Sequence, residues 1–381
     1  MECRCSDRSK ENRNGSRSRL ELPIALKHDL VNVSSVRCCG SFLLKSARSS
    51  TFVSRSVSQG AANQPEESTV SQNQKLHVVL GTGQLGRAVI HELVTRGELV
   101  RAVSRSKRVP LPKGVEFISA NLTDKAAAVR ACANASVVYH CASPPYSAWG
   151  TLVIPMMETI IEAVAETGGR IVYGDNVYMY GEVEGPITEN LPNNATGTKG
   201  RIRSKAAFTL MEAHKTGKVK ATIGRASDFF GPDVNMSLLG DQVFGRAVKG
   251  KVVNLLGDPD TPHSYTYITD FAKALVILGE REEALGHVWH VPNDRAITTF
   301  NFVDAIFEAA GKRAKVRVVP KWLYRLMSSF SPVIRELKET DYQRSKPFTV
   351  DSSNFTSTFG LTATPLIEAI RKTVAWYQAN Y

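Results

Sequence analysis

The sequence predicts an α/β fold, a doubly wound parallel sheet with a smaller C-terminal lobe. From residue 75 onwards, short apolar runs rich in β-branched residues alternate with amphipathic stretches, the pattern of a parallel sheet covered by helices on both faces. A glycine-rich turn joins the first apolar run to the first amphipathic stretch. After Gly231-Pro232 the alternation loosens into a more helical pattern, as expected for a second, smaller lobe.

Residues 1–74 differ in composition from the rest of the chain. Residues 31–59 contain nine Ser, four basic residues and no acid, which is typical of an organelle transit peptide, although five acids stand in residues 1–30. A disordered tail is the alternative. Residues 60–74 are predicted to be a polar linker. Because the segment is Ser-rich and lacks a clear amphipathic Arg helix, we expect the chloroplast or plastid stroma, with the mitochondrial matrix as the alternative.

The elements after residue 74 follow from hydrophobic periodicity. Strands are predicted, from period-two or continuous apolar runs, at 75–80, 98–104, 115–119, 136–142, 170–175 and 220–226. The first helix is predicted over 87–97, because Val89, Ile90, Leu93 and Val94 share one face and Gly97 terminates it. Later helices are predicted at 301–310 and 366–377.

Composition disfavours several classes of protein. The formal net charge of +12 is spread over short basic clusters without a recognisable nucleic-acid module, so nucleic-acid binding is not expected. No apolar run approaches the roughly 18–20 residues of a membrane-spanning helix, so no membrane span is expected. Four of the six Cys fall in residues 1–74, and no zinc spacing occurs, so neither a disulfide scaffold nor a metal site is expected.

Gly81, Gly83 and Gly86 form G-x-G-x-x-G directly after a predicted strand and at the start of a predicted helix. Glycine permits the tight turn and lets the backbone approach a pyrophosphate, whose charge meets the helix N-terminus. We therefore predict a Rossmann-type dinucleotide-binding turn, with an ordinary strand-to-helix turn as the alternative. The cofactor contacts predicted in this turn are Gly81, Thr82, Gly83, Gln84, Leu85, Gly86 and Arg87.

The end of the second strand, RAVSRSK, bears on the choice between the two nicotinamide cofactors. It contains no acid to accept hydrogen bonds from the ribose of NAD(H). Ser104 and Arg105 instead suit the 2′-phosphate of NADP(H), and Arg87 is a second candidate ligand of that phosphate. We therefore prefer NADP(H) over NAD(H); solvated loop charge is the other interpretation of Arg105. An NAD(P)-binding domain is predicted at 75–235, and a substrate-binding lobe, partly interleaved with it, at 236–381.

These features resemble the extended short-chain dehydrogenase/reductase group, the NAD-dependent epimerase/dehydratase-like family, from about residue 75 to the C-terminus. Beyond the glycine turn, the resemblance rests on ISANLTD (118–124), VVYHCAS (137–143), VYMYG (177–181), PITENLP (186–192), GRASDFFGP (224–232), YTYITDFAKAL (265–275) and FGLTATPLIEAIRKTVAWY (359–377). It implies that Asn121 and Leu122 lie beside the adenine. It also implies that the substrate is lined by Arg225, Asp228, His263 and Tyr265, although His263 could equally be a surface histidine.

The sequence departs from the resembled family where the chemistry is expected. Leu80 replaces the first glycine of its G-x-x-G-x-x-G loop, and Asn176 stands where a Ser or Thr is expected, five residues before Gly181. The resemblance implies Tyr-x-x-x-Lys ending at Lys205, but Arg201 stands at the tyrosine position. In such reductases the tyrosine transfers a proton to or from the substrate oxygen, while the lysine holds the nicotinamide ribose. Arginine cannot act as a general acid near neutral pH.

Other residues near these positions could complete a catalytic site. Two i,i+4 pairs share a helix face, Arg201 with Lys205 or Lys199 with Arg203, and the sequence does not choose between them. The family position favours Lys205 as the ribose contact and leaves Lys199 and Arg203 as substrate contacts. Tyr178 or Tyr180 could donate the proton, and Asn176 could hydrogen-bond a carbonyl. Core packing is the alternative for both tyrosines.

Three functions remain open, in order of preference. The first is an NAD(P)-dependent oxidoreductase or epimerase of the extended short-chain type, acting on a small carbonyl or sugar-like substrate without the usual tyrosine. The second is a non-catalytic NADP(H)-binding sensor or assembly protein, and the third a nucleic-acid-associated protein. The partner expected from the first is a small-molecule substrate, and a homodimer stays open.

Overall fold

A computed structural model describes residues 75–106, 109–320, 322–323, 329 and 338–381. The predicted transit peptide and linker at 1–74 lie outside the described residues. The described residues belong to one compact unit. The predicted domain division at residue 235 therefore stays a prediction.

The centre of this unit is a seven-stranded parallel sheet with the order β11-β6-β5-β4-β1-β2-β3. Its strands are β1 (Leu76–Leu80), β2 (Leu99–Ser104), β3 (Glu116–Ser119), β4 (Val137–His140), β5 (Arg170–Asn176), β6 (Lys220–Ala226) and β11 (Val288–His290). The predicted parallel α/β sheet is thus confirmed. The strand order reverses between β1 and β4, and in open parallel sheets ligands bind at the carboxyl ends of the strands beside such a reversal.

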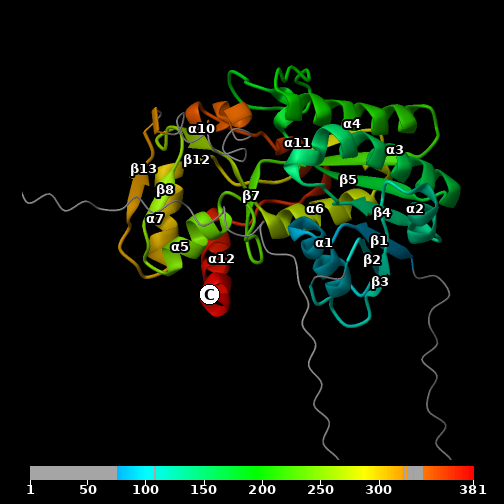
Figure 1. Cartoon of the computed structure of the whole chain (residues 1–381), viewed down its shortest axis with the longest axis horizontal. Helices are drawn as coiled ribbons and strands as arrows, with labels where there is room; N and C mark the ends of the chain where they lie inside the picture. Colours follow the sequence, from blue (N-terminus) through cyan, green and yellow to red (C-terminus); the bar gives the residue numbers. More distant parts are fainter. Residues whose placement is uncertain (1–74, 107–108, 321, 324–328, 330–337) are drawn as a thin grey trace, which may run out of the picture. The chain divides into compact units, whose positions relative to one another are not determined.

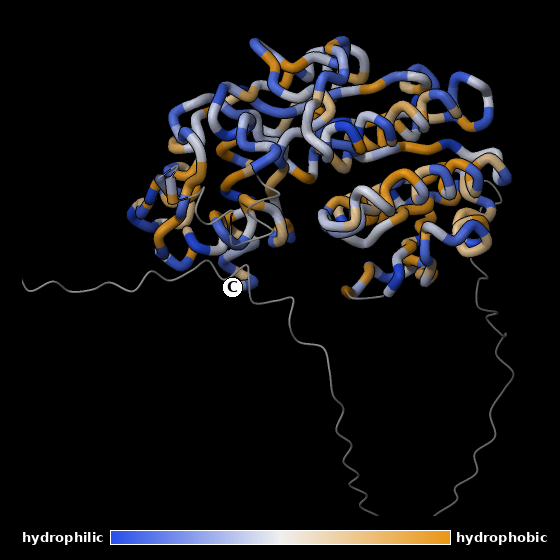
Figure 2. Tube along the Cα trace, turned by 45° about the horizontal axis from the view of Figure 1, so that its top comes forward, coloured by the Kyte–Doolittle hydropathy of each residue, from blue (hydrophilic) through white to orange (hydrophobic). Residues whose placement is uncertain are grey.

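Helices cover both faces of the sheet (Figure 1). One face carries α2 (Lys125–Cys132), α3 (Trp149–Thr167) and α4 (Thr198–Lys215), whose apolar residues join those of β4 and β5 in one core cluster. The other face carries α1 (Gln84–Thr95), α6 (Ile268–Glu280) and α11 (Ser353–Phe359). Figure 2 shows apolar segments along the strands and the helices that cover them, as burial of both sheet faces requires.

A second group of elements packs around its own aromatic core, which includes Phe230, Phe244, Phe302 and Tyr377. Its helices are α5 (Gly245–Val248), α7 (Thr299–Ala309) and α12 (Leu366–Asn380), whereas Tyr342 of α10 (Tyr342–Ser345) packs against a smaller cluster that includes Val177 and Phe348. Its strands are β7 (Asp228–Phe230), β8 (Val253–Leu255), β9 (Pro262–His263), β10 (Tyr265–Tyr267), β12 (Ile297–Thr298) and β13 (Val316–Val318), paired two by two. The helices at 299–309 and 366–380 correspond to those predicted at 301–310 and 366–377.

Short helical turns complete the described chain. They are Tyr146–Ala148, Tyr178–Tyr180, Gly240–Phe244, Glu282–Ala284 and Lys338–Thr340. Two of them, Tyr146–Ala148 and Tyr178–Tyr180, follow β4 and β5 at the carboxyl edge of the sheet, so their aromatic side chains are delivered to the edge where ligands are expected.

The apolar segment Tyr146–Thr167, which contains α3, is the one helical segment among the described residues that is long and apolar enough to cross a membrane. Met157, Ile160 and Val164 of this helix are fully buried in the core against the sheet. Because a core helix meets the same criterion of length and composition, the segment is weak evidence for a membrane span.

Candidate functional site

The glycine-rich turn between β1 and α1 has the compact geometry that the sequence predicted. Gly81 has a φ of +97°, a region that disfavours other residues, and its N–H donates to the carbonyl of Val103 at 2.7 Å. A Cβ at Gly81 would lie 2.7 Å from the backbone of Ala142, and one at Gly86 would overlap the carbonyl oxygen of Gly81. The turn therefore requires glycine at both positions.

Gly83 is different, because a Cβ there would meet no atom within 4 Å. Gly83 is the N-cap of α1, so the space beside it lies at the N-terminus of a helix whose first N–H groups need an acceptor. Open space next to a helix N-terminus suits an anionic group such as a pyrophosphate. This residue set fits a dinucleotide. Leu85 packs instead toward the sheet, where its side chain faces Gly174 of β5.

The predicted adenosine contacts lie along the neighbouring strand ends. The Thr82 hydroxyl donates to the Ser104 hydroxyl at 3.0 Å, and Ser104 donates to the Ser106 carbonyl at 2.9 Å. Arg105 is exposed and its carbonyl accepts from the Ser119 hydroxyl. Asn121 is exposed, whereas Leu122 is buried in the core beneath the sheet edge. Ser104 and Arg105 thus stand at the end of β2, as a ribose or 2′-phosphate site requires.

Arg87 and Gln84 contact the segment that follows β7. The Arg87 guanidinium pairs with the Asp233 carboxylate and also donates to the Asp233 and Thr82 carbonyls, at 3.1 Å each. With its amide oriented to accept, the Gln84 oxygen lies 2.6 Å from the Met236 N–H. Arg87, predicted to hold a phosphate, therefore has a carboxylate partner in this structure.

The first two turns of α4 decide which charged pair faces the sheet edge. Lys199 and Arg203 are buried, with 6% and 8% of their surface exposed, whereas Arg201 and Lys205 lie on the exposed face of the helix. Gly200 fixes this orientation, because a Cβ there would lie 2.7 Å from the Tyr178 carbonyl oxygen. The ribose contact expected at Lys205 is thus on the outer face, and the inward i,i+4 pair is Lys199 with Arg203.

An aromatic cluster surrounds the inward pair. The hydroxyls of Tyr146 and Tyr178 lie 2.8 Å apart, and Tyr146 packs against Trp149 with ring centroids 4.6 Å apart. The Lys199 ammonium stands 4.6 Å above the Tyr146 ring, and the Arg203 guanidinium 4.1 Å from the Trp149 ring. Burial, followed by the neighbouring Tyr146, raises the pKa of Tyr178 well above its ordinary value, so its phenol is protonated near neutral pH.

Behind this cluster, Asp175 at the end of β5 is buried between two arginines. Its carboxylate oxygens lie 3.4 Å from Arg203 Nη1 and 3.5 Å from Arg225 Nε, and Arg203 also donates to the Tyr173 hydroxyl. Burial raises the pKa of Asp175, and the two guanidiniums partly offset that rise. The predicted substrate contact Arg225 is only 3% exposed, so its partner in this structure is Asp175.

Tyr180 belongs to the same buried network and contacts Arg225 and His290. Its hydroxyl accepts from Arg225 Nη1 at 2.7 Å and lies 2.8 Å from His290 Nε2. His290 Nδ1 lies 2.9 Å from the Asp351 carbonyl oxygen, and the His290 N–H donates to the Glu189 carboxylate at 2.9 Å. Of the two tyrosines predicted as proton donors, Tyr178 is therefore the one beside the inward pair.

Asn176 ends β5, and its side-chain oxygen accepts from the Tyr178 N–H at 3.0 Å, which holds the turn that presents Tyr178. Asp228 and His263, both predicted substrate contacts, pair at 3.3 Å between Oδ2 and Nε2. Burial alone would raise the pKa of Asp228, but the hydrogen bond and charge of His263 outweigh burial and lower it. Tyr265 is buried and bonds the Thr299 hydroxyl at 2.8 Å.

The sequence reasoning did not identify Tyr146, Trp149, Asp175 and His290 as members of one site. Tyr146 and Trp149 follow β4, and Asp175 is the penultimate residue of β5. Their position after adjacent parallel strands was a usable signal, since the carboxyl ends of parallel strands meet at one edge. His290 ends β11, a strand that was not predicted. Within the described ranges, no group of three or more His, Cys, Asp or Glu is placed to hold a metal ion.

The sheet topology and the glycine turn are those of a Rossmann-type dinucleotide-binding α/β protein. Residues 78–291 match the family model described as NAD dependent epimerase/dehydratase family. The chain belongs to this family, which confirms the resemblance found in the sequence motifs.

Two curated relatives illustrate its place among characterised proteins. The chain is 25% identical over 271 residues to the mouse (Mus musculus) sterol-4-alpha-carboxylate 3-dehydrogenase, decarboxylating, covering 67% of this chain and 74% of the relative. It is 22% identical over 293 residues to the Arabidopsis thaliana 3beta-hydroxysteroid-dehydrogenase/decarboxylase isoform 2, covering 68% of this chain and 51% of the relative. The match thus spans only about half the length of the plant relative.

Solved structures show the same fold. An epimerase from Methanothermobacter thermautotrophicus superposes with a TM-score of 0.69 at 16% identity, covering 81% of this chain and 93% of that one. The UDP-glucose 4-epimerase of Thermus thermophilus, solved in complex with NAD, gives a TM-score of 0.67 at 19% identity, covering 80% of this chain and 100% of that one. At these identities the likeness concerns the fold alone.

Proposed function

We propose that this protein is an NADP(H)-dependent oxidoreductase that acts on a small carbonyl compound or the corresponding alcohol, with NAD(H) as the alternative cofactor. The observation that carries the proposal is the inward pair Lys199 and Arg203 beside the hydroxyls of Tyr146 and Tyr178. These groups lie at the carboxyl edge of the sheet that also carries the glycine-rich turn.

A bound nicotinamide dinucleotide would supply or accept the hydride. Its pyrophosphate would be held by the turn around Gly83, where a helix N-terminus and open space meet. Ser104 and Arg105 would take the 2′-phosphate at the end of β2, since that strand end carries no acid. The preference for NADP(H) rests on this last feature.

In the reducing direction, the Tyr178 phenol donates its proton to the substrate oxygen as hydride reaches the carbonyl carbon. Tyr146 lies 2.8 Å from Tyr178 and is 38% exposed, so it can return a proton from solvent to the resulting phenolate. Lys199 and Arg203 place positive charge beside the oxygen where negative charge develops. Asp175 fixes Arg203 in that position. In this arrangement Tyr178 performs the proton transfer that the family assigns to another tyrosine.

The test is a titration of purified protein with NADPH and NADH, followed by a turnover screen. Aldehydes and ketones are screened with the reduced cofactors and, given the relatives, 3-hydroxysterols with and without a 4-carboxylate are screened with NADP+ and NAD+. We expect NADPH to bind more tightly than NADH and at least one carbonyl compound to be reduced. Tyr178→Phe should then lower kcat by about 10²–10⁴-fold, the range of general acid catalysis. Unchanged turnover in Tyr178→Phe would rule out this donor.

The absence of the usual tyrosine, with Arg201 at its position and two cations, Lys199 and Arg203, turned inward, also favours a second candidate, a non-catalytic NADP(H)-binding sensor or assembly protein. If the protein is such a sensor, we expect tight dinucleotide binding and no turnover with any substrate of the screen. Tyr178→Phe should then leave the dinucleotide affinity unchanged. Delivery to a plastid and assembly as a homodimer stay predictions in either case.

A further inference from the structure

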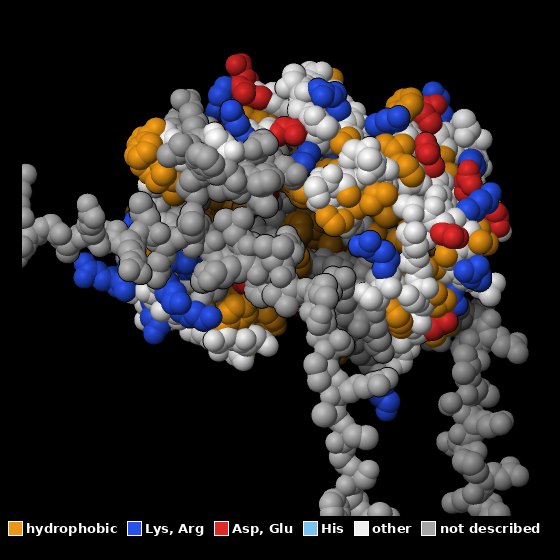
Figure 3. All heavy atoms as spheres, in the orientation of Figure 1, with side chains coloured by type: hydrophobic (Ala, Val, Ile, Leu, Met, Phe, Trp, Pro, Cys, Tyr) orange, Lys and Arg blue, Asp and Glu red, His pale blue; other side chains and the backbone are white. Residues whose placement is uncertain are grey.

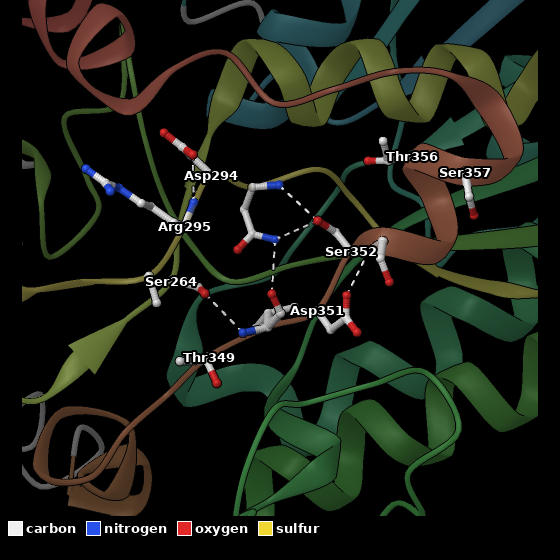
Figure 4. A pocket seen from close by; sticks show the side chains of 12 residues that line it. Ser264, Asp294, Arg295, Thr349, Asp351, Ser352, Thr356 and Ser357 are labelled. Carbon is white, nitrogen blue, oxygen red and sulfur yellow. Dashed lines mark hydrogen bonds between the residues drawn. The ribbon is translucent and has the colours of Figure 1, made fainter.

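A pocket of about 420 Å³ lies apart from the candidate active site, between the loop after β11, the segment 349–353 and helix α11. Its lining includes none of the residues to which the proposed reaction gives a role, such as Tyr178, Lys199 and Arg203. Figure 4 shows side chains from these separate segments converging around it. A volume of this size lies within the range of small-molecule sites, roughly 300–1,000 Å³.

Most residues of the lining have polar side chains, although carbon atoms contribute more of its surface than polar atoms do. Of the twelve residues around the pocket, only Ala296 and Val350 are apolar. Six carry a hydroxyl, namely Ser264, Thr349, Ser352, Ser353, Thr356 and Ser357. The Ser264 and Ser352 hydroxyls accept from Val350 and Asn293, and the Ser357 hydroxyl donates to the Asn354 carbonyl. A ligand can therefore use only the remaining donor or acceptor capacity of these three hydroxyls, together with the other three.

Asn293 is held rigidly in the wall. Its Nδ2 donates to the Ser352 hydroxyl at 3.1 Å and to the Val350 carbonyl at 3.4 Å, and its N–H donates to the same hydroxyl at 3.3 Å. The Asn293 Oδ1 is buried and has no hydrogen-bond partner among the described residues. Because this oxygen has almost no accessible surface, a ligand in the pocket does not contact it, and Asn293 serves to hold Ser352 in the wall.

The charges of the lining exclude an anion. Asp294 and Asp351 outnumber Arg295, so the formal charge is −1. The Asp294 carboxylate accepts from the N–H groups of Arg295 and Leu366, at 2.8 and 2.7 Å, and Asp351 accepts from the Ser353 N–H at 2.8 Å. That last hydrogen bond lowers the pKa of Asp351, which keeps the carboxylate charged. A phosphate or carboxylate ligand would meet repulsion here.

We propose that this pocket is a second ligand site, which binds a neutral polyhydroxylated molecule of monosaccharide or cyclitol size. Hydroxyls on such a molecule can donate to the Asp351 carboxylate and can accept from the serine and threonine hydroxyls of the lining. None of the reacting groups lines this pocket, and the Asp351 carbonyl connects it to His290 of the buried network.

The test is isothermal titration of the full chain with D-glucose, D-galactose and myo-inositol, with inorganic phosphate and glucose 6-phosphate as anionic probes. We expect at least one neutral probe to bind saturably and both anionic probes to bind more weakly. Thr349→Val and Thr356→Val remove one hydroxyl each with little change of volume. Each should weaken binding by up to about tenfold, the value of a hydrogen bond.

Thr358→Val is the matched control, since Thr358 lies in the same helix as Thr356 but is exposed and does not line the pocket. It should bind the neutral probe as the unaltered protein does, and unfolding midpoints show whether all three variants fold alike. Absence of saturable binding by every neutral probe would overturn the proposal. Tighter binding of phosphate, or equal losses in Thr358→Val and Thr356→Val, would overturn it as well.

Discussion

The glycine-rich turn and the start of helix α4 lie at the same edge of the sheet, and both place a glycine against backbone. Gly86 packs on the Gly81 carbonyl, and Gly200 on the Tyr178 carbonyl. In the turn, backbone N–H groups and open space make the binding surface, so the spacing of glycines is enough to locate it. In α4 side chains make the binding surface, so the residues that form it depend on which face of the helix is turned inward.

That difference has a chemical consequence. A rotation of α4 that brought Arg201 and Lys205 inward would leave Lys199 and Arg203 in solvent, and the sequence supports either arrangement. The structure buries Arg203 against Asp175 and Trp149. The inward pair therefore carries two cations and no phenol, and the proton donor must come from the neighbouring turn at Tyr178.

The largest effect is expected at Arg203. Arg203→Met removes one of the two cations that face the buried Asp175, and breaking a buried ion pair costs about 3–5 kcal/mol. Arg201→Met changes an exposed position of the same helix and should alter the free energy of unfolding by less than about 0.5 kcal/mol. Urea unfolding of both variants measures the two values. Similar losses in both would mean that α4 does not present the 199 and 203 face inward.

Substitution of Lys199 and of Lys205 compares the inward and the exposed face of α4 by their effect on turnover. Lys199→Met removes a cation from beside the phenol pair, and the loss of one such electrostatic group costs about 10²-fold in kcat. Lys205→Met alters the exposed face and should leave kcat within about twofold. The measurement is steady-state turnover with the substrate found in the screen. A stronger defect in Lys205→Met would instead support Lys205 as the ribose contact, as its position in the family implies.

The glycine-rich turn offers a comparison within a single motif. Gly86→Ala forces a Cβ into the Gly81 carbonyl and should destabilise the fold by about 2 kcal/mol. Gly83→Ala meets no atom within 4 Å, so stability should be unchanged while the methyl group occupies space needed by a pyrophosphate. Thermal unfolding and dinucleotide titration, carried out on both variants, separate the two effects. Undiminished dinucleotide binding by Gly83→Ala would place the pyrophosphate elsewhere.

His140, at the end of β4, should make the stability of the fold depend on pH. Burial, and then the charge of Arg203, lower its pKa from the ordinary 6.5 to about 3. Between these values the unfolded chain binds a proton that the folded chain does not. Stability should therefore fall by about 1.4 kcal/mol for each pH unit below 6.5 and be fully present above it.

His140→Gln cannot titrate, so it should show a shallower loss of stability between pH 6.5 and 5 than the unaltered protein does. Urea unfolding at several pH values measures the slope. Buried His290, whose pKa is also lowered by burial, should retain its own share of the slope in that variant. Equal slopes in the two proteins would mean that His140 is accessible to protons in the folded state.

The sequence by itself determined the architecture up to the end of β6, because period-two apolar runs separated by helical stretches can bury their faces only in a parallel sheet. It also located the glycine-rich turn, because three glycines at this spacing along the chain are typical of the tight turn between a strand and a helix that binds a dinucleotide. It missed β11, which is three residues long and lies after α6, too short for a periodic pattern.

Only the tertiary structure decided which charged residues of α4 face the sheet edge, and that Arg225 and Tyr180 belong to a buried network rather than to a substrate surface. Helix rotation is set by packing across the chain, here by Gly200 against Tyr178 and by Arg203 against Asp175. Both contacts join segments more than 20 residues apart in the sequence. Local periodicity reports which residues share a face, but the partner on the other side of the contact decides which face is buried.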